Sequence, residues 1–228
     1  MKSIAVIPAR SGSKGIKDKN IKDLCGKPLM AYSIECALKS DKFDKVFVST
    51  DSQDYASIAQ KYGADVSFLR SKDNSSDIAG SWDAVREVIE CFENQNEYYD
   101  RIMLLQPTSP LRSTEDINIC FQLMKEKEAR AILSVTEAEH SPLLCNMLAS
   151  DLSMDQFVDE KYLNIPRQML PKYYRLNGAI YLIERRELDE EIMFKNKCYA
   201  YIMPYERSID IDSDIDFKLA EYIMKNKY

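Results

Sequence analysis

Cationic and small residues near the start of the chain have the composition of a phosphate-binding loop. Arg10, Lys14 and Lys19 lie in or beside a turn rich in glycine and serine, residues 11–15, which closely follows the apolar run at residues 4–7. Small residues let backbone N–H groups approach phosphate oxygens, and lysine and arginine side chains neutralise phosphate charge. The chain contains neither G-x-x-x-x-G-K-[ST] nor G-x-G-x-x-G, so an exposed basic loop is the alternative that this spacing leaves open.

Near the other end of the chain, Asp210 and Asp212 alternate with Ile209 and Ile211. If the segment is extended, both carboxylates point to one face and both isoleucines point to the core. Two carboxylates suit Mg²⁺, which keeps several water ligands and also binds substrate phosphates. The sixth position counted from Asp210 is Ile215 and not glycine, which excludes a calcium EF-hand. The pair is therefore a candidate Mg²⁺ site.

The composition describes a soluble globular protein with one sizeable core. The chain has 228 residues, 45% of them hydrophobic and 30% charged, and a net charge of −6. A net negative chain repels nucleic acid, so any anion site must be a local basic pocket. Six scattered cysteines without a C-x-x-C pair indicate neither a zinc site nor a disulfide framework, and no apolar run has the length of a signal peptide or a membrane span. We therefore expect a cytoplasmic protein without nucleic-acid or membrane partners.

Hydrophobic periodicity predicts strands alternating with helices along most of the chain. The expected strands are residues 4–7, 45–50, 64–69, 101–105, 131–136, 178–184 and 197–203. The expected helices are residues 28–39, 52–62, 77–92, 114–127 and a last helix that begins after Ser213. Alternation of this kind specifies a mostly parallel α/β sheet that is covered on both faces.

Polar clusters follow three of the expected strands, at residues 10–20, 49–51 and 106–112. In a parallel sheet, ligands bind beyond the carboxyl ends of the strands. We therefore expect these clusters to meet in one crevice. Their convergence favours a nucleotide or sugar site.

Two helix starts are marked by the spacing of a capping box. Ser113 precedes Asp116 by three residues, and Ser213 precedes Asp216 by three residues. In such a box the serine and the acidic side chain satisfy backbone N–H groups that the first helical turn leaves free. Helices should therefore begin directly after both serines.

The alternation of strands and helices breaks between residues 139 and 174. This stretch contains Pro142, Pro166 and Pro171 and no long helical period. A loop of this length inside a compact domain is usually functional or an interaction element, and a partly ordered surface excursion is the alternative.

Short motifs spread over almost the whole chain occur together in a fixed order. They are IPAR at 7–10, KN at 19–20, GKPL at 26–29, VSTD at 48–51, LLQPTSPLR at 104–112, PRQ at 166–168, NGAIY at 177–181 and SIDID at 208–212. In combination they resemble the acylneuraminate cytidylyltransferases, or CMP-sialic acid synthetases. The resemblance implies a single three-layer α/β/α nucleotidyltransferase domain with a Rossmann-like sheet over residues 1–228. It also implies that residues 139–174 form a protruding dimerisation and substrate-lid insertion.

The resemblance also assigns roles to individual residues. It implies that Arg10, Lys19 and Asp210 are catalytic and that Asp210 and Asp212 hold Mg²⁺. The nucleotide-binding residues it implies are Arg10, Ser11, Gly12, Ser13, Lys14, Asn20, Arg70 and Ser81. The sugar-binding residues it implies are Gln106, Arg167, Arg175 and Asn177. Taken singly, the arginines at 70, 167 and 175 would be interpreted as surface cations, whereas a polar side chain directly after a buried strand, as at 106, already suggests a function.

The implied activity is Mg²⁺-dependent transfer of CMP from CTP to the anomeric hydroxyl of an N-acylneuraminate by a cytoplasmic homodimer, with release of pyrophosphate. Leu144 stands where a family member has a lysine. The acceptor is therefore open between N-acetylneuraminate and a related nonulosonic acid such as legionaminate or pseudaminate. Two other hypotheses are a metal-dependent glycosyltransferase that uses Asp210 and Asp212, and a module that binds CTP without turnover.

Overall fold

A computed structural model describes residues 1–13, 15–76, 78–188 and 195–226. Its central sheet has six strands in the order β4-β1-β5-β7-β6-β8, and a short hairpin of β2 (Asp23–Leu24) and β3 (Lys27–Pro28) lies apart from it. The strands of the central sheet are β1 (Ser3–Pro8), β4 (Lys45–Ser49), β5 (Arg101–Leu104), β6 (Ala131–Glu137), β7 (Tyr174–Glu184) and β8 (Cys198–Ile202). The helices are α1 (Leu29–Ser40), α2 (Gln53–Lys61), α3 (Ser81–Glu93), α4 (Thr114–Glu126) and α5 (Asp214–Lys225). None of these described helices has the length and apolar character that a membrane span requires.

The predicted mostly parallel α/β sheet is confirmed. Strand β1 pairs in parallel with β4 and β5, and β6 pairs in parallel with β8. Strand β7 lies between β5 and β6 and runs antiparallel to both.

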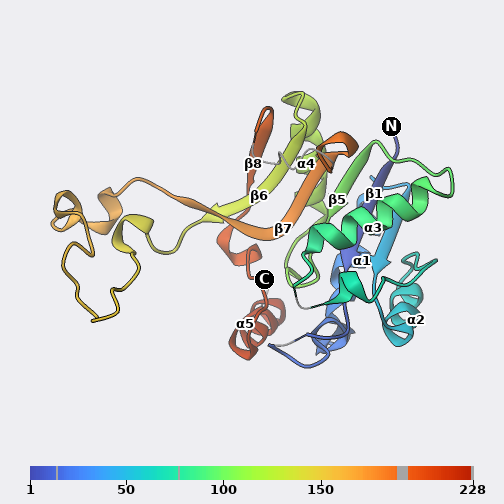
Figure 1. Cartoon of the computed structure of the whole chain (residues 1–228), viewed down its shortest axis with the longest axis horizontal. Helices are drawn as coiled ribbons and strands as arrows, with labels where there is room; N and C mark the ends of the chain where they lie inside the picture. The colour runs from blue at the N-terminus through green and yellow to red at the C-terminus, as the bar shows by residue number, and fades with distance from the viewer. Residues whose placement is uncertain (14, 77, 189–194, 227–228) are drawn as a thin grey trace.

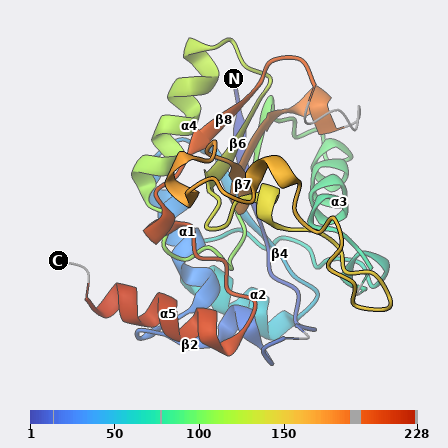
Figure 2. The same cartoon turned by 90° about the vertical axis from the view of Figure 1, so that its left-hand side faces the viewer.

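Helices cover both faces of the sheet because the side chains of each strand alternate between the faces. In β1, Ile4 and Val6 pack with side chains of α3, whereas Ala5 and Ile7 pack with side chains of α1, α2 and α4. Figure 2 shows α4 and α3 on opposite sides of the strands. The sheet is therefore the middle layer of three.

The prediction of a strand at residues 64–69 is wrong. Within this segment, which the structure describes completely, only Asp65 pairs with β4, through an isolated bridge to Phe47. The chain then leaves the sheet edge, and Phe68 packs against the rings of Phe47 and Phe92 at centroid distances of 4.7 and 5.3 Å. Packing of these rings under α3 replaces further backbone pairing at this edge.

Helix α3 begins at Ser81 and not at the predicted Asp77, which lies outside the described residues. Gly80 is the N-cap, and its N–H donates a hydrogen bond to the Asp83 carboxylate at 2.7 Å. The later start leaves residues 78–80 outside the helix, and Ala79 and Gly80 line the cavity described below.

Both predicted capping boxes are present. Ser113 and Asp116 cap α4, and Ser213 and Asp216 cap α5. We call residues 209–212 the acidic segment. Helix α5 follows it after the N-cap Ser213, so the first turn of the helix fixes one end of the segment.

Residues 138–173 project from the sheet between β6 and β7, as the yellow and orange segment at the left of Figure 1 shows. We call this segment the arm, and the rest of the described chain the sheet domain. The regular elements of the arm are short 3₁₀ helices, and Leu170 is its one buried residue. The arm corresponds to the insertion predicted at residues 139–174, except that Tyr174 belongs to β7.

Candidate active site

A cavity of about 360 Å³ lies at the carboxyl ends of β1 and β5. Its volume falls within the range of about 300–1,000 Å³ that is typical of small-ligand sites. Of the three polar clusters predicted to meet here, those after β1 and β5 line the cavity, whereas residues 49–51 do not line it and instead hold Ser11 and Arg70. The predicted site residues that line the cavity are Arg10, Ser13, Lys19, Asn20, Arg70, Ser81, Gln106, Asp210 and Asp212.

The basic loop, residues 10–20, follows β1. It is held at both ends by residues 51–55, which follow β4. The Asp51 carboxylate accepts hydrogen bonds from the backbone N–H and the hydroxyl of Ser11, both at 2.8 Å. At the other end of the loop, the Tyr55 hydroxyl donates to Asp18 at 3.2 Å. Because its hydroxyl is committed to Asp51, Ser11 supports the loop and does not line the cavity.

The basic loop touches the acidic segment backbone to backbone. A β-carbon at Gly15 would lie 2.6 Å from the carbonyl oxygen of Asp212, so only glycine fits without a shift. Lys19 donates hydrogen bonds from Nζ to the Ile211 carbonyl at 2.7 Å and to the Asp212 carboxylate at 3.2 Å. The cation of the loop and the carboxylates of the segment therefore share one wall of the cavity.

The acidic segment has the alternation that its sequence predicts. Ile209 and Ile211 are buried, and Asp210 and Asp212 line the cavity. The Ile211 N–H donates to the Thr108 carbonyl at 2.8 Å, which joins the segment to the loop after β5. Burial raises the pKa of Asp210, and the nearby Asp212 carboxylate adds to this shift. Both effects would be relieved by a bound cation.

One oxygen of Asp210 is available to a ligand. Its Oδ1 is buried and accepts no hydrogen bond from the part of the chain that the structure describes. Buried acceptors are normally satisfied, so this oxygen fits a group that the chain itself does not supply. The described residues contain no group of three or more His, Cys, Asp or Glu side chains placed to hold a metal ion. Mg²⁺ nevertheless fits two carboxylates, because it completes its shell with water and phosphate oxygens.

Two arginines, Arg10 and Arg70, also line the cavity. Arg70 is 8% exposed and donates to the hydroxyl and the carbonyl of Ser49 at 2.9 and 2.6 Å. Burial lowers the pKa of Arg70 to about 10, so the guanidinium stays charged at neutral pH. Arg10 donates to the carbonyls of residues 75–76 at 3.3 and 3.1 Å. Ser81 brings the positive N-terminal end of α3 to the cavity.

Gln106 follows β5 and lies against Gly178 of β7. Gly178 has φ +74°, and a β-carbon there would lie 2.6 Å from Oε1 of Gln106. The pairing of β6 with β7 shifts register between Leu133 and Val135, and Gly178 lies in the stretch of β7 between their partners, Tyr181 and Leu176. The register shift therefore makes room for the glutamine side chain at the cavity wall.

The structure places Asn177 in the interior and not on the cavity wall, although the family resemblance implies that it binds the sugar. Asn177 is 1% exposed, its Nδ2 donates to the Ser208 hydroxyl at 2.9 Å, and its Oδ1 accepts from Ser134 at 2.6 Å. The register shift in β7 turns this side chain inward. Asn177 joins β6 and β7 to the segment that precedes Asp210.

Other predicted residues also do not line the cavity. Arg175 is at the exposed start of β7, 3.9 Å from the Glu139 carboxylate. Arg167 is in the arm and borders a second cavity together with Glu139. Gly12 is exposed and does not line the first cavity, and Lys14 lies outside the described residues.

Gly15, Gly80 and Thr108 line the cavity, although the sequence assigns them no individual role. Thr108 belongs to the polar cluster after β5, which is the signal that could have singled it out. The role of Gly15 depends on its contact with Asp212, which no local pattern reveals.

Comparisons with known proteins agree with this geometry. A family model described as cytidylyltransferase matches residues 4–222. The chain is 39% identical over 228 residues to the N-acylneuraminate cytidylyltransferase of Escherichia coli O18:K1:H7, an alignment that covers 99% of this chain and 53% of that protein. It is 35% identical over 226 residues to the pseudaminic acid cytidylyltransferase of Campylobacter jejuni, with 99% and 97% covered.

A solved structure of CMP:2-keto-3-deoxy-manno-octonic acid synthetase complexed with CTP has the same fold. Its TM-score is 0.74 at 17% identity, with all of both chains covered. The chain spans about half the length of the E. coli relative and nearly all of the C. jejuni relative. Family model, relatives and fold all agree, and the chain therefore belongs to the cytidylyltransferase family.

Proposed function

We propose that the protein is a Mg²⁺-dependent enzyme that transfers CMP from CTP to the anomeric hydroxyl of a nine-carbon sugar acid. The observation that carries this proposal is the contact between the basic loop and the acidic segment, which brings Lys19 within 3.2 Å of Asp212. A nucleoside triphosphate bound with a cation needs basic groups and carboxylates on one wall.

The proposed reaction depends mostly on positioning and on stabilising charge. The sugar hydroxyl oxygen forms a bond to the α-phosphorus of CTP and releases its proton to solvent, the bond from that phosphorus to the oxygen bridging the β-phosphate breaks, and pyrophosphate leaves. Arg10 and Lys19 stabilise phosphate charge. Asp210 and Asp212 hold Mg²⁺, which supplies further neutralisation of the phosphates when bound.

We assign the cytidine end of CTP to Asn20, Arg70 and Ser81. Asn20 and Arg70 are 6% and 8% exposed, so they form a rigid wall. Asn20 is further held by a hydrogen bond from its side-chain amide to the Arg10 carbonyl at 3.0 Å. A rigid polar wall suits a base and a ribose, which need fixed donors and acceptors.

We assign the sugar acid to the side of the cavity nearest Gln106, with Arg175 on the approach. An arginine fork is suited to the carboxylate that such sugars carry. The relatives act on different acceptors, N-acylneuraminate in one and pseudaminate in the other, as their names state. The acceptor we propose is therefore N-acylneuraminate, pseudaminate or the related legionaminate, and Leu144 is a candidate determinant of this choice.

We further propose a homodimer in which the arm packs against a second copy. Met147, Leu152 and Met169 of the arm are 90%, 71% and 72% exposed. Apolar groups exposed together on one segment mark interaction surfaces. Arg167, which lies outside the cavity of its own chain, would then be available to the sugar site of the second copy.

Pyrophosphate release from CTP and Mg²⁺ tests the proposed function. The reaction is run with N-acetylneuraminate, with pseudaminate- and legionaminate-type acids and without sugar, and is repeated with ATP and UTP. We expect release that requires CTP and one of the acids. Absence of release with every acid, while CTP still binds, would refute the proposed transfer.

A pair of variants tests the metal assignment. We expect Asp210→Asn to raise the Mg²⁺ concentration needed for half-maximal turnover, because it removes a carboxylate charge next to the proposed ion. Asp54→Asn, an exposed change on α2, is the control. A Mg²⁺ titration that is the same in both variants would remove Asp210 from the metal site.

A further inference from the structure

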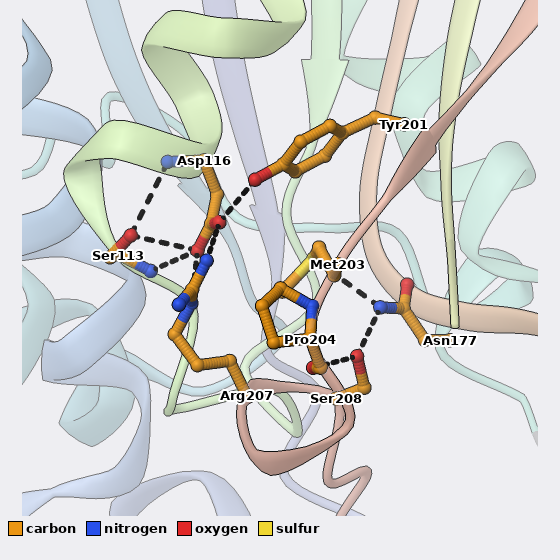
Figure 3. A network of polar contacts seen from close by, with 8 residues as sticks. All are labelled: Ser113, Asp116, Asn177, Tyr201, Met203, Pro204, Arg207 and Ser208. Atoms are coloured by element: carbon orange, nitrogen blue, oxygen red, sulfur yellow. Dashed lines mark hydrogen bonds and ion pairs between the residues drawn. The ribbon is translucent and has the colours of Figure 1, made fainter. Parts of the chain in front are cut away.

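Asp116, at the start of α4, is 0% exposed and connects three parts of the fold (Figure 3). Its carboxylate accepts hydrogen bonds from the Ser113 N–H at 2.7 Å, from the Tyr201 hydroxyl at 2.6 Å, and from Arg207 at 2.7 and 3.2 Å. Burial by itself would raise the pKa of Asp116, but the hydrogen bonds from Arg207, Tyr201 and Ser113 lower it below its ordinary value. A charged aspartate therefore holds Arg207, which ends the 3₁₀ helix after β8.

The next residue, Ser208, is fixed from the opposite side. Its hydroxyl donates to the Pro204 carbonyl at 2.8 Å and accepts from Asn177 at 2.9 Å. Figure 3 shows Arg207 directed to Asp116 and Ser208 directed to Asn177. Consecutive side chains thus point in opposite directions, and each is tied to a different element of the sheet domain.

These two fixed residues lead directly into the acidic segment. Asp210 follows Ser208 by two residues, and the intervening Ile209 is 7% exposed. Little freedom is left between residues 207–208 and the two carboxylates. A displacement of residues 207–208 would therefore carry the carboxylates with it.

We infer that Asp116 is a positioning residue for the metal-binding carboxylates, and that it acts through Arg207 on the backbone of residues 209–212. The inference rests on the proposed function, because it concerns the proposed Mg²⁺ site. The capping box by itself requires only the contact with Ser113. The bonds from Tyr201 and Arg207 lie outside the capping box and tie the start of α4 to β8 and to the residues before the acidic segment.

Three variants test the charge of Asp116 and the planar fork of Arg207. Asp116→Asn keeps the volume and one capping acceptor but removes the charge that holds Arg207. Arg207→Lys keeps a cation but loses the planar fork that makes two hydrogen bonds. We expect the second change to retain part of the function that Arg207→Met loses.

The sheet domain offers a matched control pair. Arg185 donates to the Glu93 carboxylate at 2.7 and 3.1 Å and so joins the end of β7 to α3. This pair also makes two hydrogen bonds, neither of which involves residues 207–212, and its carboxylate is more exposed than that of Asp116. Glu93→Gln therefore controls for the loss of an ion pair as such.

Three measurements test whether Asp116 positions the acidic segment. Hydrogen exchange of the Ile211 amide reports whether the segment keeps its hydrogen bond to the Thr108 carbonyl. Electron paramagnetic resonance of Mn²⁺ reports metal binding without turnover, and steady-state kinetics report the Mg²⁺ dependence of turnover. For Asp116→Asn we expect faster exchange at Ile211 and Mn²⁺ and Mg²⁺ binding weakened by about tenfold. The KM for the sugar acid should change by less than about twofold, because uniform binding of that substrate is untouched.

Unchanged Ile211 exchange and unchanged Mn²⁺ affinity in Asp116→Asn and Arg207→Met would overturn the inference. Equal effects in Glu93→Gln would also overturn it, because they would show a general loss of stability. Failure of the wild-type protein to release pyrophosphate would refute the proposed function alone. In that case the exchange and Mn²⁺ measurements would still decide the role of Asp116.

Discussion

The sheet domain and the arm differ in how much of their apolar side chains is exposed. In the sheet domain, Ile4, Phe47 and Phe92 are at most 1% exposed and lie between the sheet and α3. In the arm, Met147 and Leu152 are 90% and 71% exposed. The two regions therefore differ in how far their apolar side chains are buried, and Leu170 is the one buried residue of the arm.

This difference separates two sources of order in the molecule. In the cavity of the sheet domain, Arg70 has a partner within the same chain in Ser49, and Lys19 has one in Ile211. The arm is shaped by local turns and by few buried contacts, which gives a segment little stability of its own. Stability and nucleotide chemistry should therefore depend on the sheet domain, and the order of the arm should depend on association.

The largest effect on stability should come from truncating a core ring. Phe92→Ala removes a ring that packs on Phe47 and Phe68 at 5.3 Å in both cases, and we expect the free energy of unfolding to fall by about 3–5 kcal/mol. Met147→Ala in the arm should change it by less than about 0.5 kcal/mol. Guanidinium titrations of dilute protein measure both. A large loss at Met147 that persists on dilution would show that the arm belongs to the folding unit of the sheet domain.

The next effect concerns turnover. Lys19→Ala removes a positioned cation from the cavity, and we expect turnover to fall by about 10²–10³-fold without loss of the fold. Lys17→Ala, an exposed change in the same loop, is the control. In the arm, Arg167→Ala should raise the KM for the sugar acid and leave the KM for CTP unchanged. Steady-state kinetics in which CTP and the sugar acid are varied in turn distinguish the effect of Lys19→Ala from that of Arg167→Ala. Near-normal turnover of Lys19→Ala would exclude Lys19 from the mechanism.

Most of the sheet domain can be predicted from the sequence because its signals are local. Apolar runs that end in polar residues mark β1, β4 and β5, and the capping boxes mark where α4 and α5 begin. The exception, residues 64–69, has the composition of a strand. Its path is decided by Phe47 and Phe92, which are distant in sequence and whose rings Phe68 joins.

In the candidate site, too, some features follow from the local sequence and others depend on contacts between distant residues. The alternation of isoleucine and aspartate at residues 209–212 is local, so the facing of both carboxylates could be predicted. The direction of Asn177 depends on a register shift against β6, and the contact of Gly15 depends on the carbonyl of Asp212. The capping role of Asp116 follows from spacing, but its bond to Arg207 requires the folded chain.

A smaller effect should separate the arm from the sheet domain in association. Leu152→Asp places a charge on an apolar side chain of the arm that is 71% exposed, and we expect it to weaken the proposed dimer by at least about tenfold. Tyr98→Asp changes a residue of the sheet domain that is 60% exposed and should have no such effect. Sedimentation velocity over a concentration series measures both. Wild-type protein that sediments as a monomer at all concentrations would refute the dimer.

The last prediction compares one ion pair of an aspartate in each region. Asp116 pairs with Arg207 in the interior, whereas Asp159 pairs with Lys161 on the surface of the arm. The folded pKa of Asp116 lies below its ordinary 3.8, so its contribution to stability is complete above about pH 5 and is lost as pH falls through the lowered value. At pH 7 we expect Asp116→Asn to lower the free energy of unfolding by about 1–2 kcal/mol, because Arg207 is 30% exposed and water can partly solvate it.

Denaturant titrations between about pH 3 and pH 7 measure this difference, with Asp159→Asn as the control. The gap between wild type and Asp116→Asn should narrow as the pH falls below about 4, because the unfolded chain then binds the proton that folded Asp116 resists. The control should match wild type throughout, since an exposed pair in the arm contributes little to global unfolding. A gap that widens in acid would mean that burial outweighs the hydrogen bonds of Arg207 and raises the pKa of Asp116. Arg207 would then not be held by a charged aspartate, and the inferred positioning of the acidic segment by Asp116 would be wrong.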